Sequence, residues 1–242
     1  MRDFRRRVAL AMAVGSAAAL VPVAAPVRAD TADRTSPRTA VAAQVSTRDH
    51  RDDQVCGPPY VDDDRRLGPK YLPKTGPLGR ILEGYERYGG LSPNRFLYRY
   101  WNETAQPMGW RYPPDDGFAH DGDVVNGRPA KRRVTLRAGQ YLDRFGSERG
   151  AFLARAGASF SGRALPPDSL NTNPADPEHV CNYHVYRVVK AFDVEAGPAA
   201  PAFQQPGKDV QYHLVGSYVP GAPKALSVGW LVDTGRYLRR VN

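Results

Sequence analysis

The chain is built around the stretch LDRFGSERGAFLARAGASFSGRALPP, which spans residues 142–167. Two of its four arginines lie among three phenylalanines and four glycines that we single out: Arg144, Arg163, Phe145, Phe152, Phe160, Gly146, Gly150, Gly157 and Gly162. Glycine lets a backbone turn tightly and approach a ligand closely, because it has no Cβ. Guanidinium groups hold phosphate oxygens in a planar fork, and aromatic rings stack on flat heterocycles. The composition therefore suits a ligand that carries both phosphate and a base.

Runs of alternating polarity flank this stretch. Short strand-like pieces occur at residues 134–136 and 141–142, and a period of two predicts strands at residues 183–188 and 210–215. Residues 225–232 share this period in part. The alternation indicates a β-sheet built from short strands.

Helical signals are fewer. Apolar residues at positions 78, 81, 82, 85 and 88 predict a helix over residues 78–88 that ends at Gly89-Gly90. Residues 96–100 (FLYRY) predict a strand, and residues 150–155 a single helical turn. The sequence thus predicts an α+β fold with a small, mainly antiparallel sheet, few short helices and long loops.

The N-terminal residues 1–29 have the pattern of a secretory signal peptide. Three arginines at positions 5–7 precede an apolar run, and Val27-Arg28-Ala29 presents small residues where a signal peptidase cuts. A single membrane anchor is the alternative, but Gly15 and Pro22 interrupt the run. We expect a secreted, extracellular protein that has no membrane contact after cleavage.

Composition divides the rest of the chain. Residues 30–55 are polar and lack aromatic residues, which predicts a disordered export linker. Residues 56–94 are rich in proline and glycine at their start and predict an N-terminal extension or subdomain, followed by a main domain over residues 95–242. Three consecutive aspartates at positions 62–64 lack the spacing of a calcium loop, so we expect no metal there.

The two cysteines, Cys56 and Cys181, both lie in the exported part. Outside the cell such a pair most simply forms one disulfide. A zinc site would need more ligands than Cys181 and His184 supply. The disulfide would close a loop of about 125 residues and stabilise the fold by about 4–5 kcal/mol in the chain-entropy model.

The net charge argues weakly for an anionic partner. The whole chain carries +9, and removal of residues 1–29, with five arginines and one aspartate, leaves 29 basic and 24 acidic residues. A surplus of this size does not require nucleic acid, and none is expected as a partner.

Common enzyme motifs are absent from the sequence: it has no GxSxG elbow, HExxH motif, Walker loop or dinucleotide fingerprint. His120, His179, His184 and His213 have no spacing that selects a catalytic pair. Taken one at a time, Arg144 and Arg163 read as ion-pair residues and Gln211 as a strand residue that bonds its neighbours.

The order of the motifs is more specific than any one of them. DRFG, GAFL, SFSGRALPP, YHVYRV and then GPxxPxFxQPGxxxQY follow one another between residues 137 and 238, after GWRYPPDDGF at 109–118. This series resembles the tuberculosis necrotizing toxin family, secreted NAD glycohydrolases of bacterial toxins and fungal surface enzymes. The resemblance supports a domain of this kind over residues 95–242 and says nothing about residues 30–94.

The resemblance implies roles for single residues. Arg144 and Phe145 match the motif expected to hold the diphosphate and flank the nicotinamide of NAD+. Phe152 matches the next aromatic position, and Arg163 a second phosphate-facing arginine. Gln211 matches the glutamine that the family places beside the scissile N-glycosidic bond. We therefore expect Gln211, Arg144 and Arg163 to be catalytic, with Phe145, Phe152 and Arg163 binding substrate.

Some toxin members also use a histidine shortly after the second arginine. His179 lies too far along the chain to be assigned this role. The resemblance further implies that NAD+ is a substrate and that no cofactor is needed, with NADP+ as the related substrate. Toxin members have immunity proteins, so such a protein is the expected partner if this chain is a toxin.

Two other functions compete with hydrolysis. A secreted ADP-ribosyltransferase would use the same substrate with a catalytic glutamate beside an acidic or glutamine partner. No such pairing is seen in the sequence for any of the candidate glutamates, which are Glu83, Glu86, Glu148, Glu178 and Glu195. A non-enzymatic exported module that binds an anionic ligand is the second alternative. Release of free ADP-ribose and nicotinamide separates hydrolysis from both.

Overall fold

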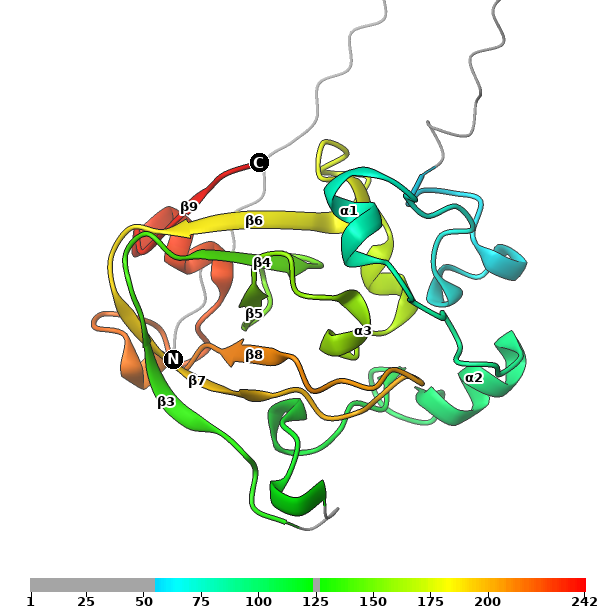
Figure 1. The fold of residues 1–242 in the computed structure, drawn as a ribbon, viewed down its shortest axis with the longest axis horizontal. Coiled ribbons are helices and arrows are strands. Elements are labelled where there is room, and N and C mark those ends of the chain that lie inside the picture. The colour runs from blue at the N-terminus through cyan, green and yellow to red at the C-terminus, as the bar shows by residue number, and fades with distance from the viewer. Residues whose placement is uncertain (1–54, 124–126) are drawn as a thin grey trace, which may run out of the picture. The chain divides into compact units, whose positions relative to one another are not determined.

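A computed structural model describes residues 55–123 and 127–242 of the chain. The predicted signal peptide at residues 1–29 and all but the last residue of the predicted linker at 30–55 lie outside these ranges. Within them, seven strands form one sheet in the order β3-β7-β8-β5-β4-β6-β9, and all neighbouring strands run antiparallel (Figure 1). None of the described helices is long and apolar enough to cross a lipid bilayer.

The sheet is made of short strands: β3 (Arg132–Leu136), β4 (Tyr141–Phe145), β5 (Phe152–Arg155), β6 (Tyr183–Val188), β7 (Phe192–Pro198), β8 (Val210–His213) and β9 (Leu238–Arg240). A separate hairpin pairs β1 (Trp101–Asn102) with β2 (Gly109–Trp110). The α-helices in the described ranges are also short: α1 (Gly76–Ile81), α2 (Pro93–Tyr100) and α3 (Phe160–Arg163). The predicted α+β class with a mainly antiparallel sheet is confirmed.

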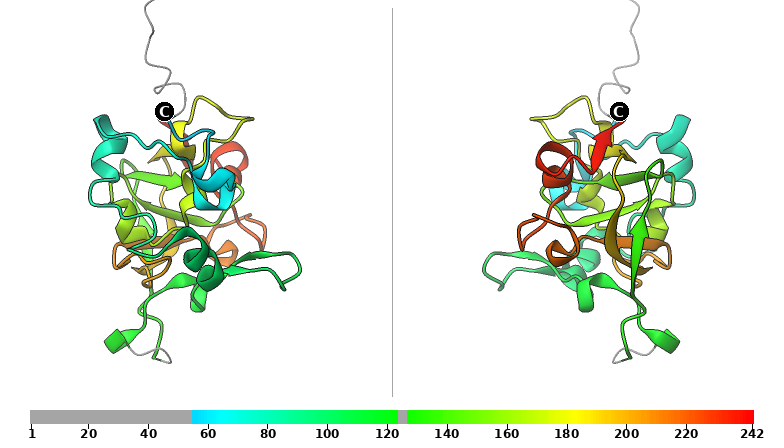
Figure 2. Two further views of the ribbon diagram at one scale, coloured as in Figure 1. Left: turned by 90° about the vertical axis from the view of Figure 1, so that its right-hand side faces the viewer. Right: turned by 90° about the vertical axis from the view of Figure 1, so that its left-hand side faces the viewer.

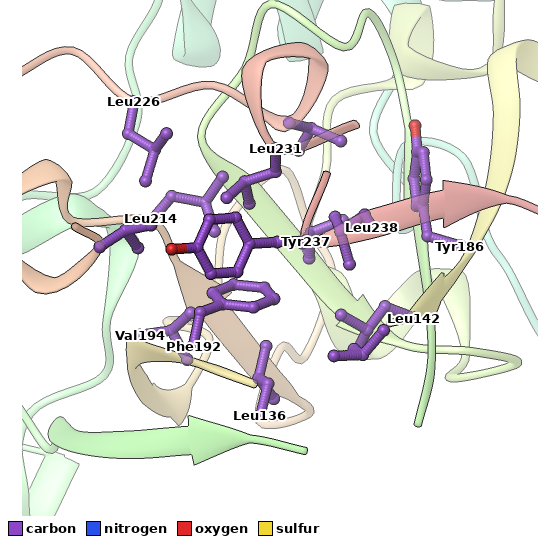
Figure 3. Packing of buried hydrophobic residues seen from close by; sticks show 14 residues of the cluster. Leu136, Leu142, Tyr186, Phe192, Val194, Leu214, Leu226, Leu231, Tyr237 and Leu238 are labelled. Carbon is purple, nitrogen blue, oxygen red and sulfur yellow. The ribbon is translucent and has the colours of Figure 1, made fainter. Parts of the chain in front are cut away.

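The sheet separates two hydrophobic clusters, because successive side chains of a strand leave opposite faces. On one face, Leu142 of β4 and Tyr186 of β6 join the larger cluster, whose centre Figure 3 shows around the rings of Phe192 and Tyr237. These two rings meet nearly edge to face, with centroids 5.7 Å apart. On the other face, Phe145 of β4 joins a second cluster that lies beneath the N-terminal segment.

The N-terminal part of the described chain gathers at one end of the sheet, where Figure 2 (left) shows its cyan and teal segments in front. Ile81 and Leu82 pack in the same cluster as Phe145, and Leu67 packs with Phe96 and Phe203 in a third. Residues 56–94 thus share buried clusters with the main domain, and the boundary expected at residue 94 stays a prediction.

The predicted disulfide is confirmed. Cys56 and Cys181 are bonded, both are fully buried, and they lie 125 residues apart in the chain. Cys56 lies near the start of the described chain and Cys181 directly before β6, so the bond ties the N-terminal segment to the sheet.

The alternating runs are where sequence and structure agree best. Residues 134–136 and 141–142 lie in β3 and β4, residues 183–188 form β6, and β8 covers the first four residues of the run at 210–215. Residues 225–232 form no strand, because Trp230–Thr234 winds into a π-helical turn that contributes Leu231 to the larger cluster.

Three of the remaining local predictions were wrong. Residues 96–100 belong to α2, because Ser92 accepts a hydrogen bond from the backbone of Arg95 and Pro93 starts the helix, which outweighs the β-propensity of FLYRY. The helix expected over 78–88 ends at Ile81, and Gly84 turns the chain with a φ of 68°. Residues 150–155 contain β5 instead of a helical turn, because β4 and β8 pair with it on both sides.

Candidate functional site

Three adjacent strands place the predicted site residues. Arg144 and Phe145 end β4, Phe152 begins β5, and Gln211 is the second residue of β8. Because β5 lies between β4 and β8, residues almost 70 positions apart in the chain reach one end of the sheet. Arg163 is the last residue of α3, which follows β5.

All five predicted side chains line one pocket of about 550 Å³. The size is in the range of small-ligand sites. The pocket is also lined by residues of the 112–117 segment and by Ala199 and Ala200, so its walls come from four separate parts of the chain. The structure therefore brings the predicted site together.

The guanidinium of Arg144 is held in the mouth of the β4–β5 hairpin. Its Nε donates to the carbonyl of Ser147 at 2.7 Å, and its Nη1 donates to the carbonyl of Phe152 at 2.8 Å. Burial lowers the pKa of Arg144 from its ordinary value, although an arginine stays protonated in proteins. With two of its five N–H groups bound in this way, Arg144 has donors left for an anion in the pocket.

Gly150 makes room for that guanidinium. A Cβ at this position would lie 2.0 Å from Nη2 of Arg144, which is closer than any carbon atom can approach. Gly162 similarly makes room for the Asp209 carboxylate, 2.1 Å from where its Cβ would be. The sequence suggested that these glycines let the backbone approach a ligand, but at these two positions the space is filled by side chains of the protein itself.

Arg163 has a structural partner that the sequence analysis did not identify. Its Nη1 and Nη2 donate to the two carboxylate oxygens of Asp143 at 2.6 and 2.9 Å, and both residues are almost fully buried. The carbonyl of Ala158 accepts from Nε and Nη2. Four of the five N–H groups of Arg163 are thereby used, which leaves one on Nη1 for a ligand.

The Asp143 carboxylate is satisfied on all sides. Besides Arg163, it accepts from the Tyr183 hydroxyl at 2.9 Å and from the backbone of Gly157 at 2.8 Å. Burial and, after it, the nearby Asp143 carboxylate raise the pKa of Tyr183 far above its ordinary value, so the phenol stays protonated and donates. The signal that could have revealed the pair is the acidic residue directly before Arg144 in the DRF motif.

The two predicted aromatic residues differ in setting. Phe145 is 4% exposed and meets Phe160 edge to face, with ring centroids 5.0 Å apart, so most of its ring belongs to the core. Phe152 is half-buried and stacks on His213, with ring centroids 4.7 Å apart and an interplanar angle of 19°. Phe152 is therefore the better placed of the two to contact a ligand ring.

Gln211 is held by the segment at 115–117. Its side-chain amide nitrogen donates to the carbonyl of Asp116 at 2.9 Å. The Asp116 carboxylate in turn lies 3.2 Å from Nζ of Lys131, which is also 2.8 Å from Glu195. A network of ion pairs behind the pocket thus fixes the backbone to which Gln211 is bonded.

Several pocket residues were not predicted. Tyr112 is 59% exposed and packs edge to face on Phe203, with centroids 5.3 Å apart. Asp116 and Gly117 lie in the PPDDGF motif, whose single residues had no predicted roles. Ala199 and Ala200 follow β7 and carry no chemical signal that could have marked them.

Asp168 lies next to the pocket residue Ser169 and has a perturbed pKa. Burial raises its pKa to about 6, against the opposing effect of the Trp110 indole, which donates to its carboxylate at 3.0 Å. This carboxyl titrates close to neutrality, which sets it apart from the surface acids of the chain.

The fold and the site together define a small α+β protein whose pocket is lined by two arginines, two phenylalanines and a glutamine. The chain matches the family described as tuberculosis necrotizing toxin over residues 135–241. It is also 43% identical over 183 residues to the conidial surface nicotinamide adenine dinucleotide glycohydrolase nadA of Aspergillus fumigatus, covering 76% of this chain and 71% of the relative. The chain belongs to the tuberculosis necrotizing toxin family.

Solved structures that match part of the chain include the tuberculosis necrotizing toxin complexed with its immunity factor IFT. It superposes with a TM-score of 0.46 and 24% identity, over 62% of this chain and 71% of that one. Tse6 in complex with Tsi6 superposes with a TM-score of 0.29 and 17% identity, over 46% and 72% of the two chains.

Proposed function

We propose that this protein is an NAD+ glycohydrolase, which cleaves the bond between nicotinamide and ribose and releases ADP-ribose. The observation that carries the proposal is that Arg144, Phe152 and Gln211 meet in one pocket of a chain that belongs to this family. We assign the reaction to residues 95–242, with residues 56–94 as an extension.

Different pocket residues contact different parts of the substrate. Arg144 binds the diphosphate with the N–H groups that Ser147 and Phe152 leave over. Phe152, backed by the parallel ring of His213, packs on the nicotinamide. Arg163 supplies one N–H to the phosphates and, through Asp143, holds β4 against α3.

The chemistry demands positioning more than acid catalysis. The C1′–N bond breaks with its electron pair on nicotinamide, which leaves as a neutral base and needs no proton. Water adds to the oxocarbenium-like ribose and gives its proton to solvent. Gln211 orients the ribose hydroxyls or the water, since its amide is fixed through Asp116.

Replacement of Gln211 tests the assignment. We expect Gln211→Ala to lower turnover by about 10²–10³, the usual effect of removing one well-placed polar group. Gln140→Ala is the matched control, because its exposed amide caps the turn before β4, outside the pocket. Full activity in folded Gln211→Ala protein would refute the role of this amide.

Product analysis separates hydrolysis from transfer. Incubation with NAD+ is expected to yield free ADP-ribose and nicotinamide, whereas a transferase would label protein. Two of the glutamates that a transferase could use have other partners: Glu148 pairs with Arg240, and Glu195 contacts Lys131 and His213. Binding of NAD+ without nicotinamide release would favour the non-enzymatic module.

We also propose that the protein is exported and acts outside the cell. The Cys56–Cys181 disulfide supports an oxidising compartment, and residues 1–29 have the pattern of a signal peptide. Mass spectrometry of the protein from the culture medium is expected to find an N-terminus at Asp30. An intact residue 1 on protein held at the membrane would favour the anchor. An immunity protein as partner stays a prediction.

A further inference from the structure

A second group of side chains suited to bind an ion lies away from the pocket, around the start of β6. Asp176, His179 and His184 each place one ligand atom within 4.8 Å of the others. His179 Nδ1 is 2.7 Å from Asp176 Oδ1, and the two imidazole rings stack with centroids 4.3 Å apart. This group is defined here as the His-His-Asp cluster.

His184 has an unsatisfied nitrogen. The residue is 4% exposed, its Nε2 lies 3.0 Å from the Asn182 side-chain oxygen, and its buried Nδ1 has no hydrogen-bond partner. With Nε2 donating to Asn182, Nδ1 carries the lone pair. Metal-binding histidines show this arrangement, in which one nitrogen is oriented by a neighbour and the other binds the ion.

There is room for a metal ion with a water ligand. The cluster lines an open cavity of about 540 Å³, whose walls also include Ser147, Asn173 and Trp230. His184 is fixed in β6, whereas His179 precedes a turn and its Nε2 makes only a 3.3 Å contact to the carbonyl of Asn242. For both histidines to bind one ion, the His179 ring must turn out of this stacked arrangement.

The other group of possible metal ligands in the described chain has its charges neutralised by the protein itself. Asp116, Glu195 and His213 also place ligand atoms within 4.8 Å of one another. There, the ammonium of Lys131 lies 3.2 and 2.8 Å from the two carboxylates and takes the position of a cation. Of these two clusters, only the His-His-Asp cluster contains a buried side-chain nitrogen without a hydrogen-bond partner.

We propose that Asp176, His179 and His184 bind one divalent transition-metal ion such as Zn²⁺, with water completing the coordination. Two imidazoles and a carboxylate are a common ligand set for zinc, with a tetrahedral geometry. His184 pairs with Arg144 across β6 and β4, so the ion lies one strand from the pocket.

Titration of the chelator-treated, full-length folded protein with ZnCl₂ tests the proposal by calorimetry. We expect one equivalent to bind, and Co²⁺ at the same site to give the intense visible absorption of a tetrahedral centre. His179→Asn and Asp176→Asn are expected to weaken binding about 10-fold or more. Both residues are only partly buried, so these variants should fold, and a thermal melt checks this.

His120→Asn is the matched control. His120 also pairs with an aspartate, at 2.9 Å from Asp115, but among the described residues these two form no group with a third His, Cys, Asp or Glu ligand atom within 4.8 Å. This variant is expected to bind Zn²⁺ like the wild type. Absence of stoichiometric binding to the wild type, or equal binding by folded His179→Asn, would overturn the proposal.

Discussion

Gly150 offers the sharpest test of how the pocket is built. A Cβ there would lie 2.0 Å from Nη2, 2.5 Å from Cζ and 2.8 Å from Nη1 of Arg144. The backbone of Gly150 is not in the left-handed region, so alanine fits its conformation. Gly150→Ala therefore expels the guanidinium from its place in the hairpin while leaving every ionisable group in the chain.

The expected loss follows from the hydrogen bonds of Arg144. The guanidinium makes two of them with the carbonyls of Ser147 and Phe152, and these two bonds aim it at the pocket. A hydrogen bond to a charged group contributes about 1.5–3 kcal/mol. If the displaced arginine loses one such contact to the diphosphate, kcat/KM falls about 10- to 150-fold.

A fluorimetric assay of NAD+ consumption measures this effect. Gly229→Ala is the control, because Gly229 has helical dihedral angles and a Cβ there would approach its nearest neighbour, the Glu148 carbonyl, only to 3.5 Å. The double variant Gly150→Ala/Arg144→Ala should be no slower than Arg144→Ala, since both changes remove the same contact. Wild-type kcat/KM in folded Gly150→Ala protein would refute the reasoning.

The remaining predictions concern stability. Asp143→Asn breaks a buried ion pair and should lower the free energy of unfolding by about 3–5 kcal/mol in urea denaturation; an unchanged midpoint would contradict the role of the pair. Replacing Cys56 and Cys181 by serine should lower the free energy of unfolding by about 4–5 kcal/mol, and a melting temperature equal to that of the wild type would count against the loop-closure argument. Asp168 has a folded-state pKa of about 6, raised above its ordinary value, so its contribution to stability is present below about pH 4 and is lost as the pH rises through 6. Asp168→Asn should therefore become more stable relative to the wild type over this range, and parallel stability–pH curves would exclude the shift.

Local sequence patterns correctly predicted several strands of the sheet. Polar and apolar residues alternate over 183–188, and this segment lies between β4 and β9 in the sheet. The period of two therefore matches its actual environment. The same reasoning failed at residues 96–100, where the cap at Ser92 controls the backbone, and at 150–155, where partners distant in sequence make β5 a strand.

The site shows the same division. The types and order of Arg144, Phe152 and Gln211 were readable from short motifs, but the distances between them depend on β8 pairing with β5, a strand distant in sequence, as well as with β7. Tyr112 and Asp116 come from a separate segment of the chain and line the pocket only in the folded protein.

By itself, the sequence determined the disulfide pair and the strands that alternate along the chain, because both are properties of residue type or of neighbouring residues. The residues of the candidate site were predicted from the resemblance to the family. Only the tertiary structure decided that Arg163 is held by Asp143 and that Gly150 leaves space for Arg144. Both depend on which strands and helices lie side by side, and a periodic pattern shows which face of an element is buried but not which particular side chain it meets there.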